Sequence, residues 1–236
     1  MLSNAQKPKD PNNTNPETNN PAVTDILKNP LVAEWNTPFQ TPPFDLIKLE
    51  HYMPAFEYAL KQAKQDIYMI ANQKSVPTFE NTVVAMDRSG ALLSRISNVF
   101  FNMLSANTSP ELQKIAQEVS PLLTQHSNEI YHNKPLFNRV KEVYKMKEKL
   151  EKPEDKMLLE KTYKAFINSG AELSLEDQEV YNNISMQLSK LSLQFSENVL
   201  SATNAFEIVF STPEELKGLP DNELAIAQEK AKAKGK

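Results

Sequence analysis

The chain has 236 residues, and 26 Lys and Arg against 30 Asp and Glu give it a formal net charge of −4. This mildly acidic balance argues against nucleic-acid binding, which calls for a positive field. The chain has no cysteine, which excludes disulfides, thiolate metal sites and cysteine nucleophiles within it. Its four glycines are isolated and allow no glycine-rich phosphate-binding loop, so the composition favours helices.

The amino-terminal region predicts a tail followed by an arm. Residues 1–24 hold six Asn and four Pro with few large apolar residues, which is typical of a flexible tail. Residues 25–48 contain four more prolines, each of which disfavours helix in the residue before it, and they predict an extended arm. We expect Trp35, Phe39 and Phe44 to anchor this arm to the body.

No targeting or membrane segment stands out. No apolar run approaches the roughly 18 residues of a membrane span, so we expect none. The first residues have neither a basic region nor an apolar core, and they do not form a signal peptide. We therefore expect a cytoplasmic protein, with the periplasm or cell envelope after removal of a leader as the alternative.

The remainder, residues 49–236, reads as one helical lobe, and the expected fold class is all-α. Apolar residues at 3-4 spacing predict helices over 49–72, 78–104 and 174–206. Helix-starting prolines and caps predict three further helices over 110–133, 135–150 and 153–169. Thr78 and Ser109 are expected N-caps, and Gly170 is expected to end the fifth helix. A short strand at 208–210, a helical turn at 212–215 and a lysine-rich last helix from Pro220 complete the prediction.

The helix near 175–206 has the clearest pattern. Its apolar positions repeat at intervals of three and four residues: Val180, Ile184, Leu188, Leu191, Phe195, Val199, Ala202 and Phe206. A seam of this length predicts the core helix of a bundle. A dimeric coiled coil is the alternative.

The three histidines do not form a metal motif. His126, Glu129 and His132 make the nearest set, but two histidines six residues apart point about 240° away from each other around a helix. We interpret His126, Glu129 and His132 as solvated surface residues, and His51 as a helix N-terminal or packing residue. The lysine run of residues 141–152 is interleaved with glutamates and predicts a solvated face. The sequence thus gives no catalytic or metal-binding residue, and substrate-binding residues stay unknown.

Several ordered segments carry a family resemblance. They are Asn29-Pro30-Leu31 with Glu34-Trp35, Thr37-Pro38-Phe39, Pro42-Pro43-Phe44, Glu50-His51-Tyr52-Met53-Pro54-Ala55-Phe56, Pro77-Thr78-Phe79-Glu80-Asn81-Thr82, Asp87-Arg88-Ser89-Gly90, Ser105-Ala106-Asn107-Thr108, Leu159-Glu160-Lys161-Thr162-Tyr163, Ser169-Gly170-Ala171 and Leu188-Ser189-Lys190-Leu191-Ser192. Residues 29–236 thereby resemble the amino-terminal half of the zinc oligopeptidases related to thimet oligopeptidase, a family that includes bacterial peptidyl-dipeptidase (dipeptidyl carboxypeptidase) and oligopeptidase A.

The resemblance implies a two-lobed helical enzyme that hydrolyses short peptides with one zinc ion. The zinc is held by a histidine motif in the carboxyl-terminal half of the family, and no such motif occurs in this chain. We therefore expect a fragment or a truncated reading frame that binds no zinc and is inactive without its catalytic half. The alternative is a non-catalytic helical interaction module derived from such an enzyme.

Overall fold

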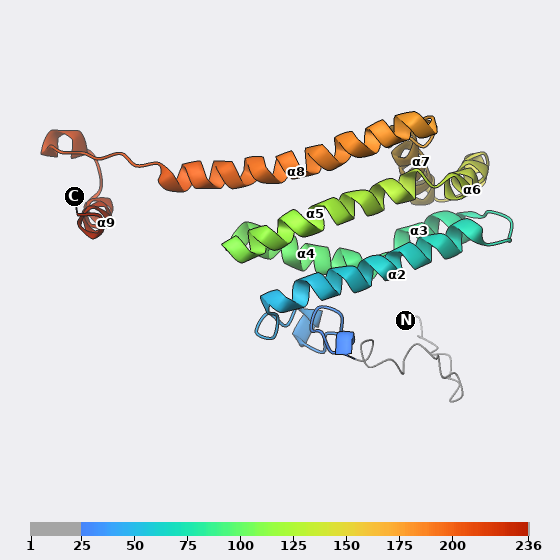
Figure 1. The fold of residues 1–236 in the computed structure, drawn as a ribbon, viewed down its shortest axis with the longest axis horizontal. Helices are drawn as coiled ribbons and strands as arrows, with labels where there is room; N and C mark the ends of the chain where they lie inside the picture. Colours follow the sequence, from blue (N-terminus) through green and yellow to red (C-terminus); the bar gives the residue numbers. More distant parts are fainter. Residues whose placement is uncertain (1–24, 236) are drawn as a thin grey trace. The chain divides into compact units, whose positions relative to one another are not determined.

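The computed structural model describes residues 25–235, and every regular element within that range is a helix (Figure 1). The predicted all-α fold class is confirmed. The predicted tail, residues 1–24, lies outside the described residues. The chain divides into two compact units at the Gln194–Phe195 bond.

The helices follow the predicted order. Those of the first unit are η2 (Pro38–Gln40), η3 (Leu49–His51), α2 (Tyr52–Asn72), η4 (Phe79–Val84), α3 (Ala85–Arg88), α4 (Ala91–Ala106), α5 (Pro110–Tyr131), α6 (Lys134–Tyr144), η5 (Lys147–Lys149) and α7 (Pro153–Asn168). The long helix α8 (Leu175–Ala205) crosses the boundary, and η6 (Pro213–Leu216) and α9 (Asp221–Ala233) lie in the second unit.

The core of the first unit is built around α2. The amino-terminal half of α2 packs against α4 and α5, where Tyr52 and Phe56 meet Phe100 edge to face at centroid distances of 5.0 and 5.4 Å. The carboxyl-terminal half of α2 packs against α6 and α7 in a second cluster, in which Phe137 stacks on Phe166 at 5.3 Å. Helix α2 therefore joins the two clusters, and its apolar face is buried along its length.

The caps at two of the predicted helix ends are confirmed. Ser109 accepts a hydrogen bond from the backbone N–H of Leu112 at the start of α5, at 3.2 Å. Gly170 follows α7 with a φ of +86°, and the N–H of Ala171 donates to the carbonyl of Phe166. This is a Schellman motif, which needs a residue that adopts the left-handed conformation easily.

The prediction of one continuous helix over 78–104 is wrong. The segment begins at Thr78 with a π-helical turn, η4, and continues into the short α3. Ser89 is then extended and Gly90 has a φ of +66°, so α4 starts afresh at Ala91. The left-handed conformation of Gly90 turns the chain, which a non-glycine residue would do only with strain.

The predicted anchors of the arm are only partly right. Trp35 packs against the first core cluster, but Phe39 is 99% exposed and Phe44 is 51% exposed, so neither is an anchor. Leu31 takes that role because its side chain is completely buried. Phe39 also has a φ of +58°, which lies in the left-handed region and turns the arm at that point.

The second unit carries little buried surface in its described residues. Residues 206–211 form no strand, so the predicted strand at 208–210 is wrong. The predicted helical turn is present as η6, where Glu215 accepts hydrogen bonds from the backbone N–H groups of Ser211 and Thr212. Lys234 near the end of α9 pairs with Glu207.

Candidate functional site

One partly buried arginine holds the arm to the helical body. A guanidinium nitrogen of Arg95, on α4, donates to the carbonyl oxygens of Leu31 and Val32 at 2.8 Å and lies 3.1 Å from that of Ala33. The guanidinium also lies 4.6 Å from the ring centroid of Trp35, within cation–π range. Burial lowers the pKa of Arg95. The first segment of the family resemblance is thus fixed by its backbone carbonyls.

Another arginine, which is buried, holds the segment that starts η4. Arg139, on α6, donates from one nitrogen to the carbonyls of Gln73 and Ser75 at 3.2 and 3.0 Å. Its other terminal nitrogen donates to Asn81 Oδ1 and Thr82 Oγ1 at 2.9 and 3.2 Å. The side chain of Arg139 is 7% exposed, and burial lowers its pKa. Because none of these four acceptors is charged, the guanidinium acts as a fork of donors rather than as half of an ion pair.

Asn81 links this arginine to the cap of η4. Its side-chain oxygen accepts from the N–H of Thr78 at 2.9 Å, and its own N–H donates to the Thr78 hydroxyl at 3.1 Å. This reciprocal pair is a capping box with Asn in the place of Glu. The side-chain NH₂ of Asn81 also donates to the carbonyl of Val76 at 2.9 Å. The polar side chains of the Pro77–Thr82 segment therefore hold the backbone of this segment in place through hydrogen bonds.

Sequence reasoning missed both arginines. Each lies between core residues of its helix: Arg95 between Leu93 and Ile96, and Arg139 between Phe137 and Val140. A cation inside an apolar stripe was the available signal, because a buried charge needs specific partners. Those partners lie more than 50 residues away in sequence, and the sequence alone does not identify them.

The histidines differ from the prediction of solvated surface residues. His126 is buried at 7% exposure, and its Nδ1 has no hydrogen-bond partner. Burial lowers the pKa of His126; Glu129 opposes this shift and Lys64 adds to it. His132 lies with Nε2 2.8 Å from the carbonyl oxygen of Ser169. Both interpretations as solvated residues were therefore wrong, because α5 turns these positions toward neighbouring helices.

The remaining members of the set have structural roles. Glu129 pairs with Lys64 at 2.7 Å and does not join the histidines in a ligand cluster. The prediction for His51 is confirmed, since its Nδ1 accepts the backbone N–H of Lys48 at the start of η3, at 3.0 Å. Over residues 25–235 no group of three or more His, Asp or Glu side chains is placed to hold a metal ion.

Two further features of the described part of the chain bear on function. None of its helices combines the length and the apolar character that crossing a membrane requires. Within the lysine run, Lys147 pairs with Glu160 at 2.7 Å, and Lys164 pairs with the same carboxylate at 2.7 Å. These two cations lower the pKa of Glu160 to about 2. The Lys147–Glu160 pair connects η5 to α7, the Lys164–Glu160 pair lies within α7, and both are structural.

Comparison with known proteins places these features in a family. No family model matches the chain. The dipeptidyl carboxypeptidase of Salmonella typhimurium is 36% identical over 208 residues, 88% of this chain and 31% of the relative. The dipeptidyl carboxypeptidase and the oligopeptidase A of Escherichia coli are 34% and 30% identical, over 88% of this chain and 30% of each relative. The chain thus spans about 30% of the length of these curated relatives, and it belongs to the family of the dipeptidyl carboxypeptidases and oligopeptidases A.

Proposed function

We propose that the chain is the amino-terminal lobe of a peptidyl-dipeptidase-like metallopeptidase, an enzyme that releases carboxyl-terminal dipeptides from short peptides. The observation that carries this proposal is the 36% identity over 208 residues with a dipeptidyl carboxypeptidase. Three of the other relatives are bacterial oligopeptidases A at 29–33% identity, which supports short peptides as the substrate class.

The proposed role of this lobe is to form a rigid helical wall beside the catalytic part. The two arginine-centred networks support a wall rather than a reactive site, because Arg95 and Arg139 donate to backbone carbonyls and to neutral side chains. These hydrogen bonds tie the arm to α4 and the Pro77–Thr82 segment to α6. The arm and the Pro77–Thr82 segment, which carry the resemblance, would then be held in fixed positions.

The zinc ion that the resemblance implies does not fit the histidines of this chain. His126 is buried among helices, His132 is bonded to a carbonyl, and His51 caps η3. Zinc sites need three or four ligands converging on one point. We therefore propose that the ligands belong to the part of the protein that this chain does not contain, and that the chain alone hydrolyses nothing.

A chimeric enzyme tests this proposal. The 208 matched residues of the Salmonella typhimurium dipeptidyl carboxypeptidase would be replaced by the corresponding stretch of this chain. The purified chimera is expected to release dipeptides from the carboxyl end of a blocked tetrapeptide, and a chelator should stop the reaction. The relative with the stretch deleted is the control and should be inactive. A folded chimera that releases no dipeptide would overturn the proposal.

The second candidate function is a non-catalytic interaction module, and the apolar side chains exposed along α8 favour it. The two candidates differ in how the isolated chain behaves. A module is expected to be a compact species that unfolds cooperatively, or to form a defined oligomer in solution. A lobe separated from its catalytic part is expected to expose apolar surface and to aggregate with rising concentration.

A further inference from the structure

Helix α8 carries an apolar stripe that no described residue covers. The outer stripe of α8 consists of Val180, Ile184, Leu188 and Leu191, which are spaced by four, four and three residues and therefore share one side of the helix. Their exposed fractions are 53%, 60%, 62% and 61%. The sequence predicted these positions to be the core of a bundle, and in this chain that prediction is wrong.

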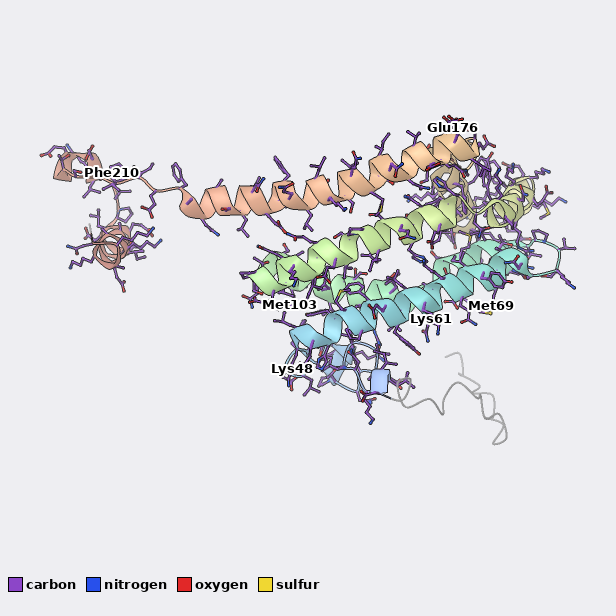
Figure 2. The ribbon with its side chains drawn as sticks, viewed as in Figure 1. Lys48, Lys61, Met69, Met103, Glu176 and Phe210 are labelled. Atoms are coloured by element: carbon purple, nitrogen blue, oxygen red, sulfur yellow. The ribbon has the colours of Figure 1, made fainter. Side chains whose placement is uncertain are left out.

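The opposite side of α8 is in contact with the body of the first unit. Tyr181 packs edge-on against His132 at a centroid distance of 5.4 Å, and Ser185 accepts a hydrogen bond from Asn128 at 2.8 Å. Leu193 packs against the first core cluster. In Figure 1 the amino-terminal part of α8 lies near the carboxyl-terminal end of α5, and Figure 2 shows side chains projecting from both sides of α8. One side of the helix is therefore occupied and the outer stripe is on the other.

Beyond Glu176, Asp177 and Glu179 near its start, α8 has the charge pattern of a helix covered on both sides. Lys190 and Glu197 are the only charged residues from position 180 to position 205, whereas charged residues make up 24% of the whole chain. Helix α9, by contrast, has five charged residues in 13 and no buried residue. A helix that stays in water carries charge on its free face, and a permanent interface is depleted of it. The outer stripe thus has the composition of a buried surface.

We propose that the outer stripe of α8 is the docking surface for the carboxyl-terminal part of the same protein. This inference rests on the proposed function. The relatives supply the occupant, because the chain matches 31% of the length of the first one and over two thirds of that protein lies outside the match. A segment in the same polypeptide has an effective concentration of about 1 mM, which favours it over a second copy of the chain.

Cysteine labelling tests the docking surface, because the chain has no cysteine of its own. Leu188→Cys places one thiol on the outer stripe, and Lys145→Cys places a control thiol on a side chain that is 68% exposed in another part of the first unit. The rate of maleimide labelling is measured in the isolated chain and in the chimera described above. Peptide mapping by mass spectrometry separates the label from any cysteine of the relative.

We expect the chimera to label at Leu188→Cys about tenfold more slowly than the isolated chain, while the rate at Lys145→Cys changes by less than about twofold. Ile184→Cys should behave like Leu188→Cys and serves if that variant does not fold. Equal rates in the chain and the chimera would overturn the inference. Slow labelling in the isolated chain that speeds up on dilution would also overturn it, since a second copy would then be the occupant. Dipeptide release by the chimera is scored separately, so an active chimera with freely labelled stripe positions refutes the docking surface and leaves the proposed function intact.

Discussion

Removing the Arg139 guanidinium should destabilise the first unit through the segment that it holds. In Arg139→Ala, four acceptors lose the hydrogen bond that the guanidinium donates to each of them. These acceptors are the carbonyls of Gln73 and Ser75, Asn81 Oδ1 and Thr82 Oγ1. Thr82 is completely buried, so water does not readily replace the arginine there.

The expected loss follows from these acceptors. A hydrogen bond to a charged group contributes about 1.5–3 kcal/mol, and a buried acceptor left without a donor costs about 1–3 kcal/mol. Water can solvate the carbonyl of the exposed Ser75, and Asn81 Oδ1 keeps the N–H of Thr78. The release of a desolvated cation offsets part of the remainder. We therefore expect the free energy of unfolding to fall by about 3 kcal/mol.

Urea denaturation followed by far-UV circular dichroism measures this change. The midpoint should fall by about 1 M with little change in slope. Arg139→Lys should lose most of the same stability, because an ammonium cannot reproduce the planar fork. Arg88→Ala is the matched control, since Arg88 is exposed and its removal should change stability by less than about 0.5 kcal/mol. If Arg139→Ala unfolds like Arg88→Ala, the network does not hold the segment.

Three further predictions concern burial and charge. Burial lowers the pKa of His126 below 6.5, so the folded chain binds a proton at this residue less readily than the unfolded chain. The contribution of His126 to stability should therefore be complete above pH 6.5 and fall as the pH drops below it. Denaturation at about pH 7.5 and about pH 5.5 should show this loss in the wild type but not in His126→Phe. The pKa of Glu160 is lowered from 4.5 to about 2, so the stabilising effect of Glu160 should be present above pH 4.5 and be lost as the pH falls toward 2. NMR titration of Lys147→Ala should find the pKa of Glu160 moved back up, and an unmoved pKa would contradict the pairing. Leu31→Ala should lower the free energy of unfolding by about 3 kcal/mol, whereas Phe39→Ala should change it by less than about 0.5 kcal/mol. Similar losses in the two variants would show that Leu31 is not the anchor of the arm.

Local pattern was sufficient to predict most of the helices. The 3-4 spacing located α2 and α8, the Ser109-Pro110 start located α5, and Gly170 marked the end of α7. The break at Gly90 was missed because apolar residues keep helical spacing on both sides of it. A single left-handed residue redirects the chain without disturbing that period.

The environment of a residue was harder to predict than its secondary structure. The spacing of Val180, Ile184 and Leu188 predicted a buried bundle core, yet these side chains are exposed in this chain. Spacing alone does not say whether the residues that would cover such a surface belong to the same chain. Arg95 and Arg139 were missed for a related reason, because their partners are mostly backbone carbonyls, which every residue possesses. No local pattern identifies which distant carbonyl a guanidinium meets.

We propose that this chain is one part of a peptidase whose metal ligands lie elsewhere, and zinc binding and peptidase activity of the purified chain test this proposal. The chain would be incubated with zinc, dialysed, assayed for bound metal by mass spectrometry, and given a blocked tetrapeptide. We expect well under one zinc per chain and no release of dipeptide. Stoichiometric zinc together with dipeptide release that a chelator abolishes would contradict the proposal.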